Sequence, residues 1–168
     1  MSPNALPDAE AQCAELAALI RPTLQATTSL VGIHSGGAWI AQRIQALLGL
    51  SGEIGLIDVS FYRDDFGQRG LHPQVQPTHL PFPVEDRTLI LVDDVLFTGR
   101  TTRAAINELF DYGRPQHIQL AVLADRGGRE LPVHPDFCVW RPDIARDEEL
   151  ILEPAANGQL QWRCKRHA

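Results

Sequence analysis

The stretch that decides the fold is "LILVDDVLFTGRTTRAA", from Leu89 to Ala105. It opens on a continuous apolar run, which predicts a strand buried on both faces. Two adjacent carboxylates, Asp93 and Asp94, follow this run, and a turn containing Gly99 then leads into a segment with helical spacing. In open α/β sheets, ligands bind beyond the carboxyl ends of the strands. We therefore expect the two acids to meet a ligand or its metal ion, because burying them unpaired in the core would be costly.

The turn after the acids predicts a site for a phosphate group. Its residues "FTGRTT" (97–102) supply hydroxyls and a glycine that lets the backbone approach closely. The first amides of the following helix have no helical partner and carry partial positive charge, which suits an anion. Read separately, such a turn is an ordinary helix start and an acidic pair is a solvated strand end. Together, after an apolar strand, they indicate a site for a ribose 5-phosphate.

The flanking sequence alternates between helical and strand patterns, which favours an α/β fold with a mainly parallel sheet covered by helices on both faces. Helices are expected at 8–24, 38–50 and 100–112, and strands at 29–34, 54–63, 88–92 and 117–124. The segment 64–87 has no clean period, so it is expected to be a lid or a binding loop. Asn157-Gly158, between two short strand-like runs, predicts a hairpin. We expect a single domain over residues 1–168.

Composition narrows the class of protein. The net charge of −6 argues against a broad basic face for nucleic acid. The three cysteines form neither a zinc pattern nor a disulfide framework. No apolar run approaches the roughly 18 residues of a membrane helix, and the first residues lack a secretory signal pattern. A cytoplasmic enzyme that does not contact a membrane is the expectation.

The opening stretch resembles the 5-phosphoribosyl-1-pyrophosphate (PRPP) motif of type I phosphoribosyltransferases. The blocks "IDVSFYRDDF", "VDDVLFTGRTTRAAINELFDYGRP" and "IQLAVLADRGGRELPV" are similar to successive blocks of the PyrR family, the pyrimidine operon regulators and uracil phosphoribosyltransferases. The similarity runs from about Gly32 to Val133, and a weaker similarity continues to Glu153. It implies a type I fold with a small hood, built largely from about 125–168, and a flexible loop at about 64–87.

The resemblance also implies an activity. PRPP and uracil would react with Mg²⁺ present to give UMP and pyrophosphate, through an oxocarbenium-like transition state that needs no protein nucleophile. Catalysis would then consist of positioning and charge stabilisation. UMP and UTP are the implied ligands, RNA is a further partner in the family, and a homo-oligomer, a dimer or larger, is expected by analogy.

By the family pattern, Asp93 and Asp94 would hold the ribose hydroxyls, directly or through Mg²⁺-bound water. The 5-phosphate would lie among Thr98, Gly99, Arg100, Thr101 and Thr102. The pyrophosphate loop would comprise His34, Ser35, Gly36 and Gly37, which otherwise form an ordinary strand-to-helix turn.

Three further site residues rest on the same resemblance. Arg63 would reach pyrophosphate, although an ion pair with Asp64 or Asp65 explains it equally well. Asp125 and Arg126 would orient the nucleobase, although a loop ion pair explains these two equally well.

Two departures from the family pattern bear on function. RNA-binding members show a basic loop resembling "RTRG" where this chain has "HSGG", so His34 and Gly36 stand at positions that would be cationic. RNA binding depends on phosphate contacts, which here would need a cluster of arginines. The candidates are Arg100, Arg103, Arg114, Arg126 and Arg129. The hood segment 138–149 also differs, which leaves uracil specificity open against a purine or orotate.

Rival functions follow from these departures. One is a non-catalytic regulator on the same fold that senses UMP or UTP and binds RNA. A signalling receiver domain also carries a "VDD" sequence, but it needs the acidic pair after its first strand and a downstream lysine. Here the pair follows the third expected strand, and Lys165 lies in the tail.

Overall fold

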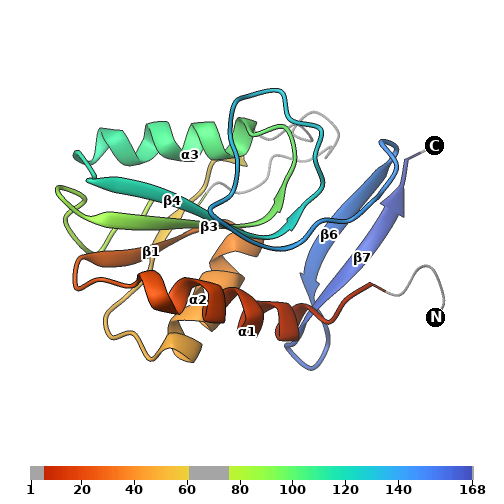
Figure 1. The fold of residues 1–168 in the computed structure, drawn as a ribbon, viewed down its shortest axis with the longest axis horizontal. Helices are drawn as coiled ribbons and strands as arrows, with labels where there is room; N and C mark the ends of the chain where they lie inside the picture. The colour runs from red at the N-terminus through yellow and green to blue at the C-terminus, as the bar shows by residue number, and fades with distance from the viewer. Residues whose placement is uncertain (1–5, 61–75, 168) are drawn as a thin grey trace.

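The computed structural model describes residues 6–60 and 76–167. Five parallel strands form a central sheet in the order β2-β1-β3-β4-β5, and β6 and β7 form a separate antiparallel hairpin (Figure 1). The strands are β1 (Thr28–Ile33), β2 (Gly55–Ile57), β3 (Thr88–Leu96), β4 (His117–Asp125), β5 (Phe137–Trp140), β6 (Glu148–Pro154) and β7 (Leu160–Arg166). The helices are α1 (Ala9–Ile20), α2 (Gly36–Leu48) and α3 (Arg100–Asp111), with a short 3₁₀ turn, η1, at Arg21–Thr23. The predicted fold class is confirmed.

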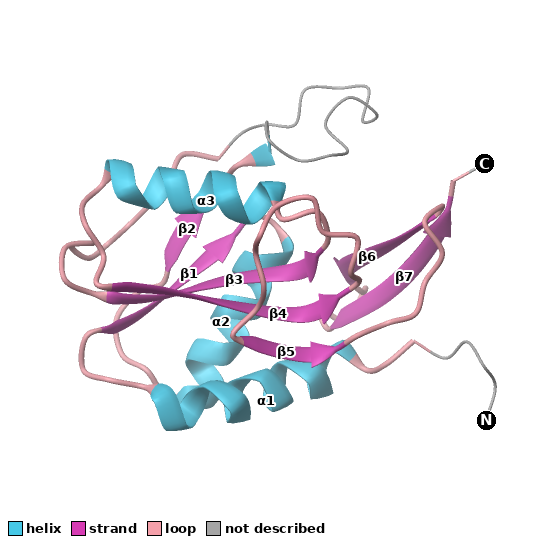
Figure 2. Cartoon of the chain, turned by 45° about the horizontal axis from the view of Figure 1, so that its top comes forward, coloured by secondary structure: helices cyan, strands magenta, loops and turns pink. Residues whose placement is uncertain are grey.

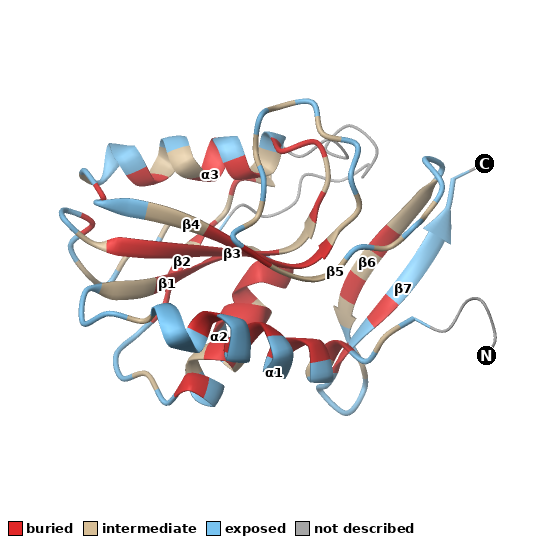
Figure 3. Cartoon of the chain, in the orientation of Figure 1, coloured by how far each residue is buried: buried red, intermediate tan, exposed pale blue. Residues whose placement is uncertain are grey.

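Strand β3 lies at the centre of the sheet because its side chains are apolar on both faces. Leu89, Ile90, Leu91 and Val92 are all fully buried. Ile90 and Val92 belong to the core cluster that includes α1 and α2, whereas Leu89 and Leu91 belong to the cluster that includes α3. The helices accordingly cover opposite faces of the sheet (Figures 2 and 3). This double cover is why the strand reads as a continuous apolar run.

Several boundaries differ from the sequence prediction. The strand expected at 54–63 is shorter, because β2 ends at Ile57. Two other differences lie where β1 and β3 end. The predicted end of β3 at Val92 is wrong, because β3 stays paired with β4 as far as Leu96. Its pairing with β1 stops at Val92, so the last part of β3 extends past its neighbour on that side. The predicted turn at 35–37 is also too long, since α2 already begins at Gly36.

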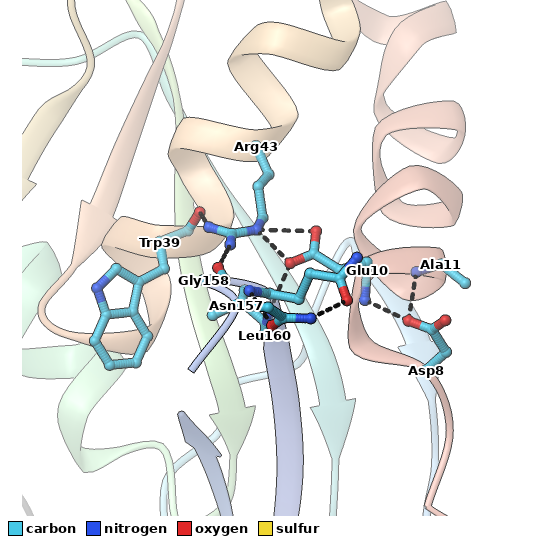
Figure 4. A network of polar contacts seen from close by, with 9 residues as sticks. Asp8, Glu10, Ala11, Trp39, Arg43, Asn157, Gly158 and Leu160 are labelled. Atoms are coloured by element: carbon cyan, nitrogen blue, oxygen red, sulfur yellow. Dashed lines mark hydrogen bonds and ion pairs between the residues drawn. The ribbon is translucent and has the colours of Figure 1, made fainter. Parts of the chain in front are cut away.

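The hairpin predicted from Asn157-Gly158 is confirmed, with Gly158 at φ +81° between β6 and β7. It is attached to α1 and α2 by a polar network around Arg43 and Glu10 (Figure 4). Arg43 donates to both carboxylate oxygens of Glu10, at 2.8 and 3.0 Å, and to the Gly158 carbonyl at 2.9 Å. Glu10 also accepts the Leu160 N–H at 2.7 Å. These bonds fix the hairpin against the helical layer.

Strand β5 belongs to the central sheet rather than to the hairpin. It pairs with β4 in parallel, through Ala121↔Phe137 and Ala124↔Trp140. Of the segment 125–168 that the sequence assigns largely to a hood, residues 137–140 therefore complete the sheet edge, and β6 and β7 stand apart from it (Figure 2).

The long segment expected as a loop at 64–87 is described only from residue 76 onward, and Arg63 lies outside the described residues. In the described part, His79 and Leu56 exchange backbone hydrogen bonds of 2.8 and 2.9 Å. Residues 78–80 thereby cover the outer edge of β2. None of the helices in the described ranges is long and apolar enough to span a membrane.

Candidate active site

The acidic pair lies in the last part of β3, beyond the end of its pairing with β1. Asp93 is 6% exposed, and Asp94 is half-buried. Each carboxylate accepts the backbone N–H of the residue that follows it, from Asp94 to Asp93 at 3.0 Å and from Val95 to Asp94 at 2.9 Å. These bonds fix both side chains near the backbone and leave the remaining lone pairs of Asp94 able to meet a ligand.

The loop between β1 and α2 packs directly on this acidic end of β3. A Cβ atom on Gly36 would lie 2.6 Å from Cγ of Asp94, and one on Gly37 would overlap the Val92 carbonyl oxygen. The peptide bond between His34 and Ser35 is cis. The structure therefore brings the predicted pyrophosphate loop into contact with Asp94, and glycine is required there because any side chain would collide.

The predicted phosphate turn follows β3 as expected. Gly99 is the residue before α3 and has φ +92°, a left-handed conformation that favours glycine. The Arg100 N–H donates to Oγ1 of Thr98 at 3.3 Å, and Thr98 and Thr102 are buried. The next amides, of Thr101 and Thr102, lie in the first turn of α3, where backbone N–H groups lack intrahelical acceptors. This arrangement suits a phosphate dianion.

The loop that follows β4 packs against the phosphate turn. The N–H groups of Glu130 and Leu131 donate to the Thr98 carbonyl at 2.9 and 3.1 Å. Arg100 pairs with Glu130 at 2.7 Å. A Cβ on Gly99 would lie 3.3 Å from Cβ of Val133, so the turn and the loop are in close contact. The phosphate turn is thus held in place from one side.

The two residues predicted to face the nucleobase lie where β4 ends. The Asp125 carboxylate binds Arg129 at 2.8 Å through both of its oxygens and also accepts the Gly127 N–H. The Arg126 guanidinium lies 4.1 Å from the centre of the Phe97 ring and donates to the Ala145 carbonyl at 3.3 Å. Asp125 therefore takes part in a loop ion pair, whereas Arg126 connects the end of the sheet to the segment before β6.

Asp58, just after β2, is a further acid near this end of the sheet. Its carboxylate accepts the N–H groups of Ser60 at 3.0 Å and of Gln76 at 2.7 Å. Burial opposes ionisation, but these hydrogen bonds and the nearby His34 outweigh it and lower the pKa of the Asp58 carboxyl. The ionised carboxylate therefore joins the two residues that flank segment 61–75.

This lowered pKa predicts a pH-dependent contribution to stability. A folded-state pKa below the unfolded value means that Asp58 stabilises the fold above its ordinary pKa of about 4 and that the contribution is lost as the pH falls through the folded value. Asp58→Asn should lower the free energy of unfolding by about 1–2 kcal/mol at pH 7. Denaturant titrations from pH 7 to pH 3 should show the difference from wild type shrinking, and a constant difference would contradict this account.

The acidic pair also fits the metal ion that the sequence predicts. Among residues 6–60 and 76–167 there is no group of three or more histidine, cysteine or acidic side chains placed to bind a metal. Mg²⁺ commonly keeps several waters and binds through one or two carboxylates together with substrate phosphates. Asp93 and Asp94 at the mouth of the sheet match that mode, with the other ligands coming from water and substrate.

Sequence reasoning missed Asp58, and it named Arg129 only as a candidate for RNA, although both residues organise this region. Asp58 carried a local signal, because an Asp carboxylate commonly accepts the backbone N–H two residues further on, here that of Ser60. Arg129 also carried one, because it follows Asp125 at a spacing of four in "DRGGR", but one of the two backbone carbonyls that it binds belongs to Phe97, 32 residues away.

Known proteins of similar sequence and fold show to which class of enzyme this chain is related. The family model for the phosphoribosyl transferase domain matches residues 4–148. A purine phosphoribosyltransferase from Pyrococcus horikoshii is 30% identical, with a TM-score of 0.62 over 80% of this chain and 82% of its own. A hypoxanthine-guanine phosphoribosyltransferase from Bacillus anthracis superposes with a TM-score of 0.65 over 85% and 86% of the two chains, and at 16% identity it shows the fold alone. Fold and site together define a type I phosphoribosyltransferase.

Sequence relatives narrow the assignment. The Bifunctional protein PyrR of Ralstonia nicotianae is 54% identical over 155 residues, covering 90% of this chain and 88% of its own. The protein of the same name from Pseudomonas entomophila is 59% identical over 122 residues, covering 73% and 71%. The chain belongs to the PyrR family, as its sequence blocks predict, and this assignment supports the predicted uracil phosphoribosyltransferase activity.

Proposed function

We propose that this protein transfers the phosphoribosyl group of PRPP to uracil, giving UMP and pyrophosphate. The observation that carries the proposal is the position of Asp94, whose carboxylate contacts Gly36 at the start of α2 and lies in the strand that leads into the phosphate turn. An acid between two helix N-termini suits a sugar that carries a phosphate at one end and a pyrophosphate at the other.

In the proposed reaction, N1 of uracil bonds to C1 of the ribose as the bond from C1 to pyrophosphate breaks. The electron pair of the broken bond leaves with pyrophosphate, and the N1 proton is released to pyrophosphate or water. Asp93 and Asp94 hold the ribose hydroxyls and counter the positive charge that develops on the ring. The amides and hydroxyls of residues 98–102 hold the 5-phosphate, and the amides of residues 34–37 meet the leaving group. When bound by the two acids through water, Mg²⁺ supplies charge neutralisation to the pyrophosphate. The chain contributes orientation, so no protein nucleophile is needed.

The identity of the base is tested by pyrophosphate release from PRPP and Mg²⁺ with uracil, hypoxanthine, guanine or orotate. We expect turnover with uracil alone. Turnover with hypoxanthine or guanine instead would point to a purine substrate, the class after which the Pyrococcus horikoshii enzyme is named. Binding of UMP without turnover of any base would favour the alternative function, a nucleotide-sensing regulator that is not an enzyme.

RNA binding is the second candidate function, because the family resemblance implies it and the relatives are named "Bifunctional protein PyrR". Of the five arginines that would have to cluster for RNA binding, three contact other side chains and a fourth lies at a distance. Arg129 is paired with Asp125, Arg126 stacks on Phe97, and Arg100 pairs with Glu130. Arg114 lies beyond the far end of the 12-residue helix α3, about 18 Å from Arg100.

We therefore expect weak RNA binding. In filter binding at about 0.15 M salt, a pyrimidine leader RNA should bind no more tightly than the non-specific range of about 10⁻⁴ to 10⁻⁶ M, with or without UMP. Tight binding that depends on UMP would show that the regulatory function is retained. The expected homo-oligomer stays a prediction, which light scattering on the purified protein tests.

A further inference from the structure

We propose that Arg129 is a positioning residue for the phosphate turn, which it holds in register with the end of β4. This inference rests on the proposed function, because it assigns a role in binding the 5-phosphate end of PRPP. Arg129 lies in the loop after β4, and its side chain is 23% exposed.

Each nitrogen of the Arg129 guanidinium binds a different residue: two of these residues lie four positions away in the chain, and the third, Phe97, lies 32 positions away. Nη2 binds both oxygens of Asp125, the last residue of β4, at 2.8 Å. Nη1 donates to the Phe97 carbonyl at 2.8 Å, and Nε donates to the Val133 carbonyl at 2.7 Å. A guanidinium can serve acceptors in three directions because its donors form a rigid planar fork, which a lysine ammonium lacks.

The bond to the Phe97 carbonyl connects Arg129 to the proposed substrate site. Phe97 directly precedes Thr98, whose own carbonyl accepts two N–H groups from the same loop. These three bonds hold the peptide units before Gly99, and the path of those units sets the direction of the amides at the start of α3. Losing the Arg129 bond would free the first of these units, and small displacements of binding groups are costly in catalysis.

The bond to Asp125 gives the same guanidinium a second contact at the end of the sheet. The Arg126 N–H also donates to the Leu96 carbonyl at 3.0 Å. The end of β4 is therefore connected to the end of β3 twice, once by this backbone bond and once through the Arg129 side chain. Arg129 thus fixes the distance between the phosphate turn and the strand end that the resemblance places beside the nucleobase.

The test compares Arg129→Lys with Arg43→Lys. Arg43 is a matched control, because its side chain is 25% exposed and it also binds one carboxylate and two backbone carbonyls, of Trp39 and Gly158, away from the phosphate turn (Figure 4). Calorimetry with ribose 5-phosphate gives Kd, steady-state assays give KM for PRPP and kcat, and thermal melting gives Tm. Both variants should lose Tm to a similar extent.

Only Arg129→Lys should raise Kd for ribose 5-phosphate and KM for PRPP, each by about tenfold or more, with a smaller change in kcat. If wild type binds ribose 5-phosphate and Arg129→Lys binds it within about twofold, the inference is wrong while the proposed function stands. If wild type does not turn over PRPP with uracil, the proposed function fails and the inference fails with it. If wild type turns over PRPP but binds ribose 5-phosphate too weakly to measure, an unchanged KM for PRPP in Arg129→Lys contradicts the inference. Should Arg129→Lys not fold, Asp125→Asn must weaken ribose 5-phosphate binding in the same direction, and wild-type affinity in that variant contradicts the role.

Discussion

Asp94→Asn is expected to lower kcat for pyrophosphate release by at least about a hundredfold, with little change in stability. The substitution keeps the size of the side chain and the oxygen that accepts the Val95 N–H. It removes the negative charge that the proposed function places beside the ribose ring. That charge matters most in the transition state, where positive charge develops on the sugar, so the loss should appear in kcat more than in KM. Steady-state kinetics with PRPP and uracil measure both.

The matched control is Asp111→Asn at the last residue of α3, which is exposed and lies at the opposite end of the helix from the phosphate turn. It makes the same change in net charge and should keep wild-type kcat. Wild-type activity in Asp94→Asn would refute the role of the carboxylate. Equal losses in both variants would mean that net charge, rather than position, matters.

Gly37→Ala is expected to lower both the free energy of unfolding and the turnover. A glycine inside a helix is ordinarily improved by alanine, by roughly 0.5–1 kcal/mol. Here the added Cβ would overlap the Val92 carbonyl oxygen and lie 3.1 Å from the Asp93 Cα. Both contacts are with backbone, which cannot rotate away, so α2 or β3 must shift. Overpacking of this kind costs about 1–3 kcal/mol, and it displaces the two elements that meet at the acidic pair.

Gly49→Ala, at the other end of α2, is the control. Gly49 has φ +66° and open space around it, so alanine there costs about 1–2 kcal/mol through its backbone conformation alone. Urea denaturation and kinetic assays should show that Gly49→Ala loses stability but keeps its turnover number, whereas Gly37→Ala loses both. Unchanged or raised stability in Gly37→Ala would show that the close contact between α2 and β3 does not exist in solution.

The central part of the site was predictable because its signals are local. An apolar run followed by two acids, a glycine turn and a helical pattern specifies a buried strand that opens on a helix N-terminus. The structure places Asp93, Asp94 and residues 98–102 in that order. The hairpin at Asn157-Gly158 was predictable for the same reason, since a short turn between paired strands depends on its own backbone conformation, here with Gly158 at φ +81°. Roles of individual residues in binding PRPP or uracil stay predictions.

The boundaries of the site depended on pairing between distant segments. Nothing in the sequence of β3 shows that its pairing with β1 ends at Val92 while its pairing with β4 continues to Leu96. This difference leaves one edge of β3 unpaired beside the two acids. Likewise, the "DRGGR" sequence contains an ion pair at a spacing of four, but nothing in it shows that Arg129 also donates to the carbonyl of Phe97, 32 residues away.

The sequence by itself determined the α/β class, the apolar central strand, the acidic pair with its phosphate turn and membership of the PyrR family. Periodicity, turn chemistry and residue order along one segment carry that information. Only the tertiary structure decided that Gly36 lies on Asp94, that Arg129 donates to the Phe97 carbonyl just before the phosphate turn, and that Arg100, Arg126 and Arg129 contact Glu130, Phe97 and Asp125. Each of these is a contact between segments, and its free energy depends on distances that arise only when the sheet, helices and loops pack together.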